Sequence, residues 1–179
     1  MYIRFLVLSF MVSVAACSAP PPPPKTMPAA RPATITPTPV AAPVRQPGEW
    51  MDWPLTPGDW VYRRDERGSI ALFGVPGADA LVTLRCDTGR GKIYLARANV
   101  AGMGSATFTL RSSSTLKEFT AQSTGGPLPY LATEIMPNDT VLDAIIYTRG
   151  RIALETTGQS SLAIPSWSEI ARVVEDCRG

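Results

Sequence analysis

The chain has 179 residues, a formal net charge of +2 and no histidine. Without histidine, the sequence lacks the commonest general base and metal ligand, which excludes serine–histidine–acid, cysteine–histidine and histidine-based zinc sites. The 18 prolines and three cysteines are unevenly spread. This distribution divides the chain into a leader, a spacer and one domain of ordinary size.

The leader ends in a short motif. Arg4 precedes an apolar run over residues 6–16, which is shorter than the roughly 20 residues that a membrane-spanning helix needs. Val14-Ala15-Ala16-Cys17 resembles the lipobox of bacterial lipoproteins, in which the cysteine is acylated before the signal is cut. The resemblance implies a signal peptide over residues 1–16 and a lipid on Cys17. The alternative is an ordinary secretory signal cut near Ala16.

The same resemblance predicts where the protein is located. Two or three acyl chains on Cys17 would hold it stably on a membrane, so the membrane is an expected partner through the lipid. In such lipoproteins an aspartate after the cysteine retains the protein at the inner membrane, whereas this chain has Ser18. We therefore expect a cell-envelope protein anchored in the outer membrane and facing the periplasm.

The number of cysteines supports the lipid on Cys17. Acylation of Cys17 leaves Cys86 and Cys177, which can form a disulfide in the oxidising compartment that the signal implies. The alternative is a pair of buried free thiols.

Residues 17–48 read as a disordered linker that follows the lipidated cysteine. Residues 18–48 hold eleven of the 18 prolines, and their only charges are Lys25, Arg31 and Arg45, so they cannot bury a core. In polyproline geometry, which rises ~3.1 Å per residue, this segment would reach up to roughly 90 Å. It is either a stalk that holds the domain at a distance from the membrane or a low-complexity tether whose length hardly matters.

Residues 49–179 read as a single β-rich periplasmic domain. They carry 13 Lys and Arg against 15 Asp and Glu, a net charge of −2, with no basic stripe of the kind that a nucleic-acid-binding protein needs. Period-two alternation or short apolar runs between glycine turns predict strands. These strands span residues 59–64, 69–74, 80–86, 92–98, 106–111, 116–121, 130–135, 151–156 and 160–164. Their spacing predicts an antiparallel β-sandwich or open barrel.

Two helices interrupt this pattern. We expect Asn138 to cap a short helix over residues 139–148. Ser166-Trp167-Ser168-Glu169 fits a capping box for a C-terminal closing helix. That helix carries one apolar stripe of Ile170, Val173, Val174 and Cys177. We therefore expect it to pack on the sheet and to be joined to strand 80–86 by the disulfide.

The sequence predicts no catalytic residue, no metal site and no cofactor. A hydrolase that uses carboxylates alone would need several of them to converge around an open cleft. The candidates are Glu134, Asp139, Asp143 and Glu155. Acidic residues at 139 and 143 already have a structural explanation in the helix dipole.

The aromatic entry of the domain is the candidate partner surface. Trp50, Trp53 and Trp60 would form an exposed patch, which is typical of a binding surface. The alternative is that these rings clamp the first strand onto the sheet.

The end of the chain resembles a known group. Thr148-Arg149-Gly150-Arg151 through Leu162-Ala163-Ile164-Pro165 to Cys177 is similar to the invasion-associated locus B group, which implies a strand pair leading into a short closing helix and transfers no functional residue. We expect a non-enzymatic domain that binds an envelope protein. The alternatives are a domain that binds a small ligand or cell-wall glycan, and a carboxylate-based hydrolase.

Overall fold

The computed structural model describes residues 48–179. The signal peptide, Cys17 and the proline-rich linker therefore lie outside the described residues, and the predictions made for them remain predictions. Nearly every strand and helix expected in the domain is found within one or two residues of its predicted position.

The domain is mainly β, as predicted. Nine strands form one antiparallel sheet in the order β1-β2-β3-β4-β7-β6-β5-β8-β9. The strands are β1 (Asp59–Asp65), β2 (Gly68–Gly74), β3 (Val82–Asp87), β4 (Lys92–Ala98), β5 (Ser105–Arg111), β6 (Leu116–Ser123), β7 (Tyr130–Ile135), β8 (Arg151–Thr156) and β9 (Gln159–Pro165).

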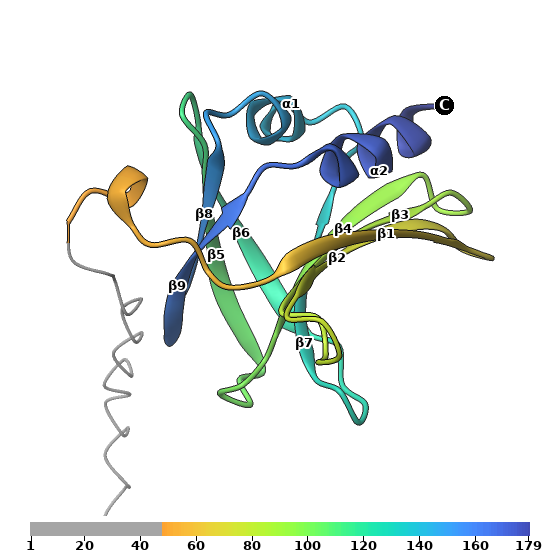
Figure 1. Cartoon of the computed structure of the whole chain (residues 1–179). Coiled ribbons are helices and arrows are strands. Elements are labelled where there is room, and N and C mark those ends of the chain that lie inside the picture. Colours follow the sequence, from red (N-terminus) through yellow and green to blue (C-terminus); the bar gives the residue numbers. More distant parts are fainter. Residues whose placement is uncertain (1–47) are drawn as a thin grey trace, which may run out of the picture. The chain divides into compact units, whose positions relative to one another are not determined.

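Of the two predicted architectures, the structure has the open one, a single sheet curled into a half-barrel. The pairing between β6 and β7 is the shortest in the sheet and is limited to Gln122↔Ala132 and Ser123↔Leu131. Figure 1 shows the two arms that result, one built from β1 to β4 with β7 and the other from β5, β6, β8 and β9.

Two helices cover the interior of the curl at one end (Figure 1). They are α1 (Thr140–Ile146) and α2 (Ser168–Arg178), and α2 packs against α1 and strands β1 to β4. The apolar stripe predicted for α2 is buried at Ile170, Val173 and Val174, and half-buried at Cys177. The closing role expected of this helix is thus found.

Both predicted helix caps are wrong. Asp139 caps α1 in place of Asn138, since its Oδ1 accepts a hydrogen bond from the Val141 amide at 3.0 Å. At α2, Trp167 occupies the N-cap position without a side-chain bond. Ser166 instead donates to the carbonyl of Ile145 at 2.6 Å, because a helix end leaves carbonyls that need donors.

The entry segment covers β9, which is the last strand of the sheet. The Thr56 amide donates to the Ala163 carbonyl at 2.7 Å, and the Ala163 amide donates to Thr56 Oγ1 at 3.2 Å. Trp60 Nε1 in β1 donates to the Pro165 carbonyl at 2.8 Å. These bonds connect the two ends of the strand order and protect an edge that would otherwise expose unpaired backbone groups.

Within residues 48–179, neither helix has the length and apolar character required to cross a membrane.

Candidate functional site

The predicted aromatic surface is wrong for two of its three residues. Trp53 is 4% exposed and Trp60 is 6% exposed, whereas Trp50 is half-buried. Trp53 packs with Trp50 against Ala153 and Ala163. These rings therefore clamp the entry segment onto the sheet, which is the alternative that the sequence left open.

Trp60 offers no stacking face for a sugar. Its ring packs against Phe73 with the centroids 5.2 Å apart. The cavity that it lines has a volume of about 20 Å³ and is walled by apolar side chains such as Leu84 and Ile170. That volume holds about one water molecule, so the glycan cleft expected beside the aromatic entry does not form at this ring.

The strongly exposed aromatic side chains lie elsewhere. Tyr147, at the end of α1, is 81% exposed, and Trp167, just before α2, is 44% exposed. The hydrogen bonds from Ser166 to Ile145 and Ile146 hold the two chain segments together at this junction. The sequence did contain a signal, because neither ring belongs to the apolar stripe of its helix.

The four carboxylates that are candidates for a hydrolase site each form an ion pair with a different cationic side chain. Asp139 pairs with Lys117 at 2.5 Å, Asp143 with Arg178 at 2.7 Å and Glu134 with Lys92 at 2.6 Å. Glu155 is buried and pairs with Arg111. Among the described residues, no three histidine, cysteine or acidic side chains are grouped closely enough to hold a metal ion.

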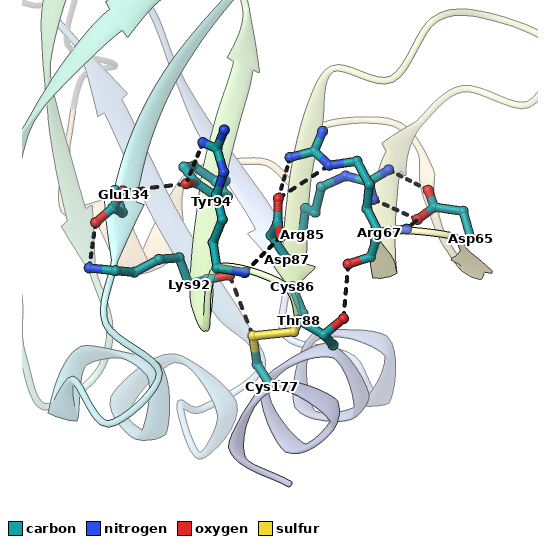
Figure 2. Close-up of polar contacts among 11 residues, drawn as sticks. Asp65, Arg67, Arg85, Cys86, Asp87, Thr88, Lys92, Tyr94, Glu134 and Cys177 are labelled. Carbon is teal, nitrogen blue, oxygen red and sulfur yellow. Dashed lines mark hydrogen bonds and ion pairs between the residues drawn. A yellow bond between two sulfur atoms is a disulfide. The ribbon is translucent and has the colours of Figure 1, made fainter.

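A row of ion pairs crosses the sheet near the end of α2 (Figure 2). Arg85 binds both carboxylate oxygens of Asp65, at 2.9 and 2.6 Å, and this bonding lowers the pKa of Asp65 from 3.8 to about 2. Arg67 pairs with Asp87 at 2.7 Å. Together with Lys92 and Glu134, these groups form the ionic row.

The ionic row lies beside the predicted disulfide. Cys86 of β3 and Cys177 of α2 are bonded, with their Cα atoms 5.4 Å apart (Figure 2). The bond joins the closing helix to the predicted strand. This end of the sheet is thus held by both covalent and ionic links.

The opposite end of β4 contains a polar group that the sequence analysis missed. Arg97 is 2% exposed and follows Ile93 and Leu95 on the buried side of the strand. Its Nη2 donates to the Ser160 carbonyl of β9 at 2.5 Å. The side chain therefore reaches across the interior of the curl from the middle of the sheet to its last strand.

We call three buried side chains, linked through the Arg97–Ser160 hydrogen bond and the β8–β9 pairing, the interior polar cluster: Arg97, Thr156 and Gln159. The Nε and Nη1 atoms of Arg97, the hydroxyl of Thr156 and both amide atoms of Gln159 are buried without a hydrogen-bond partner among the described residues. Thr156 and Gln159 face each other across the β8–β9 pairing, and Gln159 precedes Ser160. Burial lowers the pKa of Arg97 from its ordinary value to about 10.

In comparisons with known proteins, no family model, no curated protein and no solved structure matches this chain.

Proposed function

We propose that this chain is a lipid-anchored cell-envelope protein whose domain acts by binding a partner protein and not as an enzyme. The observation that carries the proposal is the bond between Cys86 and Cys177. It accounts for two of the three cysteines and leaves Cys17, the residue at the lipobox position, as the third. Stable structural disulfides are typical of proteins exported from the cytosol.

The arrangement of charges favours binding over catalysis. The carboxylates best placed for hydrolysis are engaged by Lys92, Lys117, Arg111 and Arg178. A general acid or base needs a proton-transfer group free to reach a substrate, and these ion pairs serve the stability of the sheet and α1 instead.

The partner surface that we propose is the junction of α1 and α2. Tyr147 and Trp167 expose large aromatic side chains there, and aromatic residues contribute strongly to protein–protein contacts. This surface replaces the buried tryptophans as the candidate for an envelope partner.

The anchor is tested by growing cells that express the wild type or Cys17→Ser with radiolabelled palmitate and analysing the mature amino terminus by mass spectrometry. We expect label and a diacylated or triacylated cysteine in the wild type alone. An unmodified mature amino terminus in the wild type would overturn the anchor.

The partner surface is tested by photo-crosslinking in intact cells. The double variant Tyr147→Ser, Trp167→Ser should lose a crosslinked band that the wild type forms, while Leu116→Ser, a matched loss of an exposed apolar residue on β6, should keep it. An identical band pattern in all three proteins would exclude this junction as the binding surface.

A further inference from the structure

Arg97 occupies a place where an apolar residue is expected. In the sheet it pairs with Val82 on one side and Leu131 on the other, and both are fully buried. Its side chain thus leaves the strand among apolar neighbours. A cation in such a place is unfavourable unless an opposite charge and hydrogen bonds compensate for its lost hydration.

The protein supplies little of that compensation. Within the described part of the chain, the Ser160 carbonyl is the single hydrogen-bond acceptor for the guanidinium, and none of the ion pairs involves Arg97. A carbonyl is neutral, so the positive charge stays without a counter-charge. Buried polar groups are partnered in nearly all proteins, and an exception calls for an explanation.

The other two members of the interior polar cluster add matching chemistry. Gln159 and Thr156 are both more than nine-tenths buried, and their unpartnered atoms include the Gln159 amide donor and the Thr156 hydroxyl. An amide N–H, a hydroxyl and a guanidinium all donate to oxygen. Gln159 directly precedes Ser160, whose carbonyl binds Arg97, and Thr156 pairs with Gln159, so the three groups come from backbone positions that adjoin one another.

A loop lies over this end of the sheet. The Asn99 side chain donates to the Met103 carbonyl at 2.7 Å and accepts from the Met103 amide at 2.9 Å, which holds residues 99–103 in a tight turn. Met103 Sδ lies 2.8 Å from the position that a Cβ on Gly158 would occupy, so it packs directly on the β8–β9 turn. Methionine is flexible and repacks readily, which makes Met103 the side chain that a ligand would displace.

We propose that the interior polar cluster is a binding site for the carboxylate group of a small, singly charged molecule. A carboxylate accepts from the free guanidinium nitrogens, the Gln159 amide and the Thr156 hydroxyl, and these charge-assisted bonds are stronger than neutral ones. One negative charge neutralises one guanidinium, whereas a phosphate dianion would leave an uncompensated charge in an apolar setting. The site is independent of the lipid anchor and of the α1–α2 junction.

The test uses the full-length protein in detergent, with acetate as the probe. Thermal unfolding is followed in sodium acetate, sodium chloride and sodium phosphate at equal ionic strength, and in neutral acetamide. A ligand of the folded state raises the unfolding midpoint with its concentration. We expect a saturable rise in acetate that is absent in chloride and acetamide and smaller in phosphate, together with a shift of the Arg97 Nε–H NMR signal.

Two variants locate the effect. Arg97→Met removes the charge and should abolish the acetate response, and Gln159→Leu should weaken the apparent affinity roughly tenfold, because one hydrogen bond to a charged group is lost. Arg85→Met, a matched loss of an arginine from the ionic row, should respond as the wild type does. If Arg97→Met does not fold, Gln159→Leu alone still carries the test.

Two results would overturn the proposal. One is an acetate response in the wild type that equals the chloride response, which would mean that water alone satisfies the guanidinium. The other is an acetate response that Arg97→Met and Gln159→Leu leave unchanged.

Discussion

The two ends of β4 show opposite ways of placing charge in this sheet. At Lys92 the strand joins the ionic row, and the adjacent residue Ile93 pairs with the disulfide-bonded Cys86. At Arg97, five residues along, the guanidinium lies buried with one neutral acceptor. The first end has the features of a stabilising device. The second carries an electrostatic cost that stability does not explain, which is why we assign a ligand to it.

The largest expected loss of stability comes from removing the disulfide beside the Lys92 end of β4. The Cys86→Ser, Cys177→Ser variant removes a cross-link between residues 91 positions apart, which is worth about 4 to 5 kcal/mol of unfolding free energy on the chain-entropy model. Urea unfolding of the variant and of the wild type measures the difference, and wild type treated with dithiothreitol should match the variant. Equal midpoints with and without the cross-link would show that α2 is held by packing alone.

A smaller loss of stability is expected from breaking the contact between the two outermost strands, β1 and β9. Trp60→Phe removes the Nε1 donor and leaves the buried Pro165 carbonyl without its partner, which costs about 1 to 3 kcal/mol. Trp167→Phe is the matched control, because that ring is 44% exposed and lies before α2, outside β1 and β9. Urea unfolding should separate the two variants, and similar midpoints would contradict the idea that Trp60 holds β1 to β9.

The strands were predictable because each signal is local. Alternation such as Ile93 and Leu95 fixes a face, and glycines at the turns fix the ends. The tryptophans were misplaced because no local pattern shows that the entry segment folds back over Ala153 and Ala163. Their burial depends on the distant residues against which they pack in the fold, and the sequence reports such long-range contacts only indirectly.

The interior polar cluster lies between these cases. Arg97 continues the alternation of Ile93 and Leu95 on the buried face of β4, although the sequence analysis did not single it out. A charged residue on an apolar face is a readable signal. Thr156 and Gln159 could not be connected with Arg97 from the sequence, because only the curl of the sheet brings β9 across to β4, where Ser160 binds Arg97.

The smallest of the three expected effects on stability is that of acid, which should distinguish the paired end of β4 from its unpaired end. The pKa of Asp65 is lowered to about 2 by Arg85. Burial raises the pKa of Asp176, but hydrogen bonds from Tyr62 and Arg64 outweigh it, so the net shift is also downward. A lowered pKa in the folded state means that the unfolded chain binds protons first as the pH falls. The stabilisation from both carboxylates is therefore present above their ordinary pKa and is lost as the pH falls below it; for Asp65 the loss continues down to about pH 2.

Urea midpoints measured from pH 7 to pH 2 should fall in that window for the wild type. In Arg85→Met the fall should be shallower, because Asp65 has lost the partner that lowers its pKa. Arg97→Met should keep the wild-type profile, since the pKa of Arg97, about 10, lies far above the window. A flattened acid profile in Arg97→Met would mean that its guanidinium is coupled to a carboxylate, and the contrast between a paired end and an unpaired end would then be wrong.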